Sequence, residues 1–246
     1  MKKLAVTLLI FMSPFFVAFS YGQETKWDYP VKPGTEQWKS FQTTPEILTA
    51  LQIPDEILKS LSTEELLTIC LNYPLLTSYI FSDSPFEGMN GVVQSFNGFE
   101  AFSSRNNMGE VLLSFYERKQ ISEIGQIEKG IDKASFKFYH CGIELLLCNN
   151  KIISKLSKDQ QTNILKLVMK KYVEKLSFMD SFGFWGKMTS AFVGNKYASL
   201  LGKQDADSDE QLKNAKKLFS ERMLMTDLKV VDVILVDVDK FVKELK

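Results

Sequence analysis

SKDQQTNILKLVMKKYVEKL, residues 157–176, carries a clear secondary-structure signal. Ser157 is a suitable helix N-cap, and apolar residues then recur at steps of three and four, as on one side of an α-helix. We expect the inward side to hold Ile164, Leu165, Leu167, Val168, Tyr172 and Val173. We expect the other side to face solvent or, as an alternative, an anionic surface, and it carries Lys158, Lys166, Lys170, Lys171 and Lys175.

Short helices are predicted on the N-terminal side of this segment. Thr44-Pro45-Glu46 gives a cap, a first-turn proline and a first-turn acid, and Pro54 begins a second helix. Ser62-Thr63-Glu64-Glu65 matches a capping box before a third. Shorter apolar clusters follow in residues 85–119, and a longer helix is predicted over 121–149, with Ile131 and Phe136 in its apolar stripe.

Three further segments follow residue 176. Residues 178–201 form an apolar segment of the helical domain whose glycines lower its helix propensity, and a helix is expected over 211–224. Residues 227–246 are rich in β-branched residues and are compatible with a strand, but Val231, Leu235 and Val238 recur at helical spacing, which favours a helix. The sequence therefore predicts an all-α fold, an irregular array of antiparallel helices, with a solenoid-like array as an alternative.

The first 22 residues match a cleavable secretory signal peptide. Lys2 and Lys3 precede an apolar run from Leu4 to Phe19, which ends in small residues at 20–22. The run is shorter than the roughly 20 residues of a membrane-spanning helix, so cleavage is favoured over an uncleaved anchor. We then expect an irregular strap rich in proline and aromatic residues over 23–43 and a helical domain over 44–246, with a sub-boundary near residue 120.

The charge balance argues against binding of nucleic acid. The chain has 30 basic and 30 acidic residues, and removal of Lys2 and Lys3 leaves 28 and 30, a net charge of −2. Nucleic-acid binding by charge requires a basic excess. The mature protein is expected to be exported, periplasmic or extracellular in a bacterium, and not integral to the membrane.

Residues able to do chemistry are few. The chain has one histidine, His140, so a zinc site has too few ligands unless the cysteines join in. We expect His140 to be buried or capping, on the same helix face as Glu144, with a catalytic or metal role as the alternative. Cys70, Cys141 and Cys148 lie in apolar surroundings and are expected to be buried free thiols; the alternative is a disulfide from Cys70 to one of the others. The acidic run 205–210 is expected to be a solvated loop in which Asp207 or Asp209 caps the next helix, rather than a calcium loop.

The segment 178–201 is the most apolar part of the mature chain. We favour a place in the core, and its alternative is an exposed patch that binds a partner. The candidate residues of that patch are Phe178, Phe182, Phe184, Trp185, Met188 and Phe192.

Several short motifs resemble a known module. They are YPVKPGTEQW at 29–38, LSTEEL at 61–66, LNYPL at 71–75 and FNG at 96–98. Together they resemble the N-terminal helical module of a group of uncharacterised exported bacterial proteins. Some of those proteins carry an additional Asn-Cys-His-Ser-Tyr-Ala-Trp-like motif suggestive of a cysteine amidase, which this sequence lacks. The resemblance implies export and a helical module and transfers no catalytic residue.

The leading functional hypothesis is a non-enzymatic exported protein that binds a partner or acts as a scaffold in the cell envelope. No catalytic, cofactor or metal-binding residue is assigned from the sequence. A hydrolase that uses Cys141, Cys148 or dispersed carboxylates is the second hypothesis, and a surface adhesion component is the third.

Overall fold

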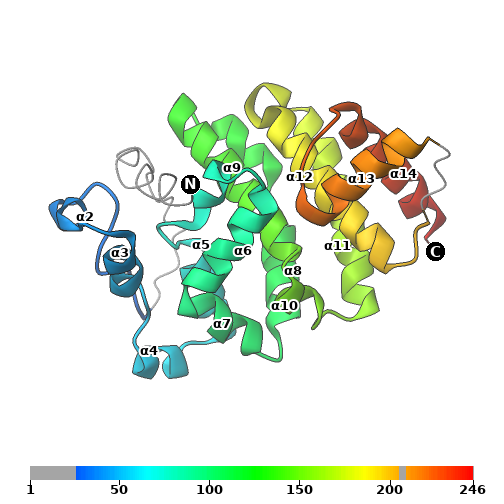
Figure 1. The fold of residues 1–246 in the computed structure, drawn as a ribbon. Helices are drawn as coiled ribbons and strands as arrows, with labels where there is room; N and C mark the ends of the chain where they lie inside the picture. The colour runs from blue at the N-terminus through cyan, green and yellow to red at the C-terminus, as the bar shows by residue number, and fades with distance from the viewer. Residues whose placement is uncertain (1–25, 205–208, 246) are drawn as a thin grey trace.

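The structure is a computed structural model that describes residues 26–204 and 209–245. All regular secondary structure in these ranges is helical (Figure 1), which confirms the all-α prediction. The expected signal peptide, residues 1–22, lies outside the described residues. The α-helices are α2 Glu36–Ser40, α3 Thr44–Ala50, α4 Asp55–Ser60, α5 Thr63–Leu71, α6 Pro85–Ser95, α7 Asn97–Ser104, α8 Met108–Arg118, α9 Gly130–Leu147, α10 Asn150–Ile153, α11 Lys158–Leu176, α12 Met179–Leu200, α13 Glu210–Arg222 and α14 Lys229–Glu244. Two short 3₁₀-helices are η1 Leu76–Phe81 and η2 Ile121–Gln126.

Helix starts follow the capping residues of the sequence. The Ser62 hydroxyl accepts a hydrogen bond from the Glu65 amide at 3.2 Å, and the Glu65 carboxylate accepts one from the Ser62 amide at 2.8 Å. Ser157 caps α11, and Asp209 caps α13 by accepting from the amides of two following residues. Each cap satisfies backbone donors that a helix start leaves unpaired.

The prediction of one helix over 121–149 is wrong at its N-terminal end. Residues 121–126 form η2 instead, and α9 begins at Gly130. Ile121 and Ile124 are fully buried in η2, whereas Ile131, expected inward, is 50% exposed. Burial of η2 against neighbouring helices outweighs the continuous helical pattern, and Gly125 and Gly130 lower the helix propensity of residues 121–130.

The ambiguous C-terminal segment is a helix, as favoured from its spacing. Val231, Leu235 and Val238 of α14 are buried on one side, against α12. Near the N-terminus, residues 26–43 contain only the short helix α2, and Tyr29 ties them to α5 by donating to the Ile69 carbonyl at 2.8 Å.

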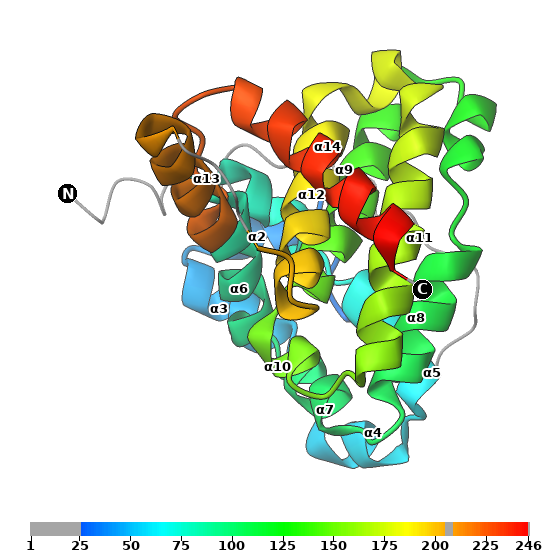
Figure 2. The ribbon, with the colours of Figure 1, turned by 90° about the vertical axis from the view of Figure 1, so that its right-hand side faces the viewer.

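Helices α9, α11 and α12 form the centre of the molecule. Helix α12 packs against α9, α11, α13 and α14. The short helices α2–α4 lie at one end and α13 and α14 at the other, and the turned view places α14 across α12 (Figures 1 and 2). Within the described ranges, no helix has the length and apolar character needed to cross a membrane.

Candidate functional site

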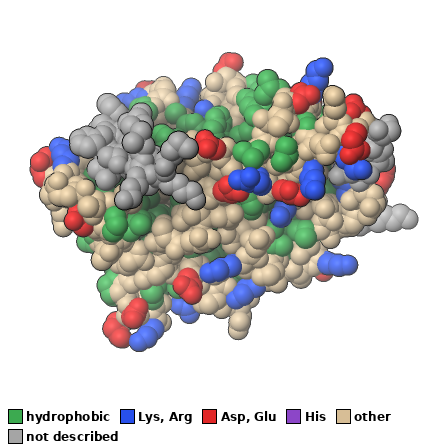
Figure 3. Space-filling view, in the orientation of Figure 1, with side chains coloured by type: hydrophobic (Ala, Val, Ile, Leu, Met, Phe, Trp, Pro, Cys, Tyr) green, Lys and Arg blue, Asp and Glu red, His purple; other side chains and the backbone are tan. Residues whose placement is uncertain are grey.

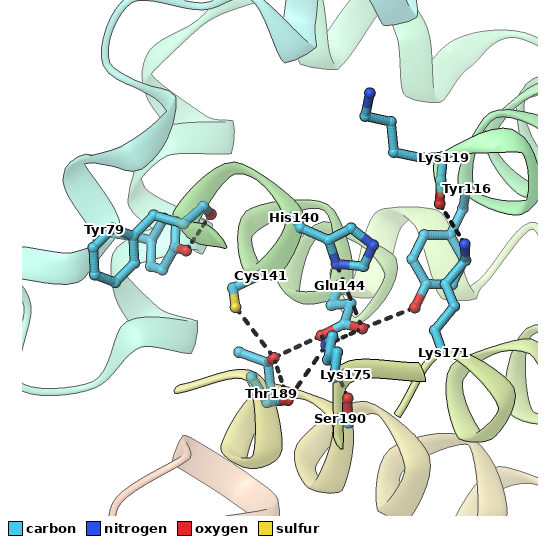
Figure 4. Close-up of polar contacts among 12 residues, drawn as sticks. Tyr79, Tyr116, Lys119, His140, Cys141, Glu144, Lys171, Lys175, Thr189 and Ser190 are labelled. Carbon is cyan, nitrogen blue, oxygen red and sulfur yellow. Dashed lines mark hydrogen bonds and ion pairs between the residues drawn. The ribbon is translucent and has the colours of Figure 1, made fainter. Parts of the chain in front are cut away.

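The second half of α9 runs through the middle of the protein. Every residue from Tyr139 to Asn149 is buried, so this helix is enclosed on all sides. A helix buried all round is normally apolar all round. Helix α9 instead places His140, Cys141 and Glu144 in this interior, and they are the start of a polar network (Figure 4).

Glu144 and Lys175 form a closed ion pair. The Lys175 Nζ atom lies 2.6 Å from each carboxylate oxygen of Glu144, and both side chains are 1% exposed or less. The same ammonium donates to the Ser190 hydroxyl at 2.9 Å and to the Gly186 carbonyl at 3.3 Å. The pair satisfies its hydrogen-bonding capacity within the protein, as a buried charge requires.

Two hydroxyl groups complete the surroundings of the Glu144 carboxylate. Tyr116 of α8 donates to Oε1 at 2.8 Å, and Thr189 of α12 donates to Oε2 at 2.6 Å. Burial, followed by the neighbouring Glu144 charge, raises the pKa of Tyr116 well above its ordinary value, so this phenol stays protonated. Four helices, α8, α9, α11 and α12, are thereby joined at one carboxylate.

The predicted solvent-facing lysine side of α11 is wrong at two positions. Lys171 and Lys175 are 2% and 1% exposed, and they continue the inward stripe of Ile164 and Val168. Lys171 donates through Nζ to the backbone carbonyl of Lys119. Val173, expected inward, is instead 61% exposed. Hydrogen-bond partners inside the protein hold Lys171 and Lys175 inward, although the apolar pattern of the sequence predicts that they face solvent.

His140 is buried, as expected, and is 0% exposed. Neither ring nitrogen has a hydrogen-bond partner, and Nδ1 lies 3.8 Å from Glu144 Oε1, beyond hydrogen-bonding distance. Burial, together with Lys175, Lys171 and Lys119, lowers the pKa of His140 well below its ordinary value. The imidazole is therefore neutral in the folded protein at neutral pH.

All three cysteines are buried free thiols, as favoured from the sequence, and the alternative disulfide from Cys70 is not formed. The Thr189 hydroxyl lies 3.5 Å from the Cys141 sulfur. Burial raises the pKa of Cys141 to about 11, and it also raises the pKa of Cys70 and of Cys148. Cysteine chemistry requires an accessible thiolate, and all three of these residues are enclosed thiols.

The six residues of the expected aromatic patch do not form one surface. Phe182, Met188 and Phe192 are buried, as in the favoured core interpretation. Phe178 and Trp185 are half-buried, and Phe184 is 38% exposed. Helical geometry causes this division, because six residues spread over 15 positions cannot all lie on the same side of a segment whose helix packs against four others.

The acidic run 205–210 lies partly outside the described residues. Asp209 caps α13, whereas Asp207, the other candidate, lies outside the described residues. In residues 26–204 and 209–245, no group of three or more His, Cys, Asp and Glu is placed to hold a metal ion.

The sequence alone does not identify this network as a site. It places His140 and Glu144 on one helix face, but it does not connect them to Tyr116, Lys175, Thr189 and Ser190. One signal is present: Lys171 and Lys175 continue the spacing of the inward stripe, at 164, 168, 171 and 175. Chemically, the closed network can hold four helices together, but its charged groups are out of reach of a substrate from solvent.

Comparison with known proteins adds no relative. No family model matches this chain, and it matches no curated protein and no solved structure. The resemblance to a helical module of exported bacterial proteins stays a prediction.

Proposed function

We propose that this protein is a non-enzymatic, exported helical component of the bacterial cell envelope that binds a partner or acts as a scaffold. The observation that carries this proposal is the enclosure of His140, Cys141, Glu144 and Lys175, each at most 1% exposed. Glu144 and Lys175 connect helices, and the imidazole of His140 and the thiol of Cys141 are enclosed with them. Export is supported by the signal-peptide pattern of residues 1–22.

The proposed binding surface is an aromatic area over the N-terminal halves of α9 and α12. Trp185 of α12 and Phe138 of α9 are half-buried, and their rings meet edge-to-face at 5.4 Å. Phe184 directly precedes Trp185 in the sequence and is exposed, and Lys137 lies 4.4 Å above the Phe138 ring. Hydrophobic side chains are exposed over α9 and α12 between charged ones (Figure 3). Rigid aromatic residues of this kind are frequent anchors of protein interfaces. The proposal includes an irregular, solenoid-like array of antiparallel helices as the support of this surface.

Site-specific photo-crosslinking in cells tests the binding role. A photoreactive residue in place of Phe184 is expected to give one defined adduct. The matched control is Leu218 of α13, which is 39% exposed against 38% for Phe184. The absence of an adduct at position 184, or the same products at both positions, would contradict the proposed surface.

A separate measurement tests the proposal that the protein has no enzymatic activity. The purified mature protein is incubated with peptidoglycan and with envelope lipids, and release of soluble fragments is followed. We expect no release above that of a heat-unfolded sample. Reproducible turnover that is lost in Cys141→Ala or Glu144→Gln would favour the hydrolase alternative.

A further inference from the structure

A small apolar cluster lies beside His140, and two of its aromatic rings are near neighbours of the imidazole. It consists of Ile121, Ile124, Phe136 and Phe182, with Ile127 and Phe178 packed against it, and it is distinct from the main core. The rings of Phe136 and Phe182 lie 6.3 Å and 5.8 Å from the imidazole of His140. We call residues 119–127, which contain η2, the η2 lid.

The lid packs on a satellite cluster that is separate from the main core. It packs on α9 and α11 through η2, and Lys171 donates to the Lys119 carbonyl at its start. The Phe178–Phe182 turn beside it is joined to the rest of α12 at Gly183, whose φ of 54° and ψ of −151° are non-helical. A short 3₁₀-helix on a satellite cluster is expected to open at lower free energy than the main core.

The charges around His140 disfavour a second positive charge. Glu144 from the same helix already has Lys175 as its counter-ion, and Lys171 lies on the same side of α11. Lys119 forms an ion pair with Glu123 of the lid, and Glu174 interacts electrostatically with Lys171. Tyr116 from α8 and Cys141 from α9 are neutral, and the nearby α12 side chains are Phe182, Thr189 and Ser190. A proton on the closed imidazole would be a buried, uncompensated charge.

We propose that His140 is the proton-uptake site of an acid-triggered opening of the η2 lid. When the lid is closed, His140 is sealed, neutral and without a hydrogen-bond partner. When the lid opens, water reaches the imidazole, which can then accept a proton. The same movement exposes Phe136, Phe178 and Phe182 as new apolar surface.

The direction of the pH effect on lid opening follows from the pKa of His140 in the closed and open states. The closed state has a His140 pKa well below the ordinary 6.5, and the open state has a pKa near that value. The open state therefore binds more protons, and acid favours it once the pH falls through 6.5, down to the lower pKa of the closed state. Between about pH 7.5 and about pH 5, the opening constant is expected to rise about thirtyfold.

Hydrogen exchange of the full mature chain tests this proposal. Exchange rates of amides 121–127, corrected for intrinsic pH dependence, are compared at the two pH values in the wild type and in His140→Phe. We expect the roughly thirtyfold acceleration in the wild type and its loss in the variant, while amides 190–197 of α12 keep their protection at both pH values. Equal acceleration in both proteins, or acceleration at 190–197 as well, would overturn the proposal.

A second measurement covers the case in which His140→Phe fails to fold. His140 is the only histidine of the chain, so its imidazole NMR signal is unambiguous in an untagged protein. We expect no titration of the closed state near pH 6.5 and the growth of a second, protonated signal in acid. A single signal that titrates with a pKa of about 6.5 would overturn the inference.

Discussion

At the scale of single residues, Lys175 is the side chain on which the interior depends most. It neutralises Glu144 and binds Ser190 and a backbone carbonyl in a region without solvent. We expect Lys175→Met to lower the free energy of unfolding by about 3–5 kcal/mol, because it leaves the Glu144 charge buried and unpaired. Urea unfolding followed by circular dichroism measures this change.

The control for this prediction lies on the same helix. Lys170 is exposed, so Lys170→Met should change stability by no more than about 0.5 kcal/mol. The double variant Glu144→Leu/Lys175→Met removes both charges and should recover most of the loss. A Lys175→Met protein as stable as the wild type would show that the pair does not form.

At the scale of elements, α11 shows why spacing alone places its residues only in part. The apolar spacing correctly predicts the helix and its inward residues Ile164 and Val168. It cannot show that Lys171 and Lys175 lie inward, because their partners, the Lys119 carbonyl and Glu144, are distant in the sequence. Polarity predicts the face of a helix only when the opposing surface is apolar.

The kink of α12 at Gly183 leads to a prediction about protein stability. Gly183 has backbone angles that other residues rarely adopt, although an added Cβ would meet no atom within 4 Å there. Gly183→Ala should therefore destabilise the protein by about 1–3 kcal/mol through backbone strain alone. Thermal unfolding measures the effect.

Gly91 in α6 is the matched control for Gly183. It is exposed, has no atom within 4 Å of an added Cβ, and does not have a positive φ. Gly91→Ala should stabilise the protein by about 0.5–1 kcal/mol, since alanine favours a helix interior. If both variants changed stability in the same direction, the kink at Gly183 would be in doubt.

At the scale of the whole molecule, the sequence predicts the fold class and most helix positions, but not how the parts share a core. Capping residues such as Ser62 and Ser157 are local signals, and they mark helix starts correctly. The polar network depends on contacts between four helices, and η2 depends on burial, so neither has a local signal. The sub-boundary expected near residue 120 stays a prediction, and the main core cluster includes residues on both sides of it.

Cooperative unfolding tests that boundary. Cys70 of α5 lies before residue 120, Cys148 at the end of α9 lies after it, and both are fully buried in the main core cluster. We expect two single-cysteine variants, Cys141→Ala/Cys148→Ala and Cys70→Ala/Cys141→Ala, to give the same free energy of thiol exposure when alkylation is followed across a urea series. A continuous core exposes distant thiols in one transition, with one dependence on denaturant. Alkylation of Cys70 at clearly lower urea than Cys148 would mean that the N-terminal helices unfold as a separate unit, because only the first transition would then involve α5.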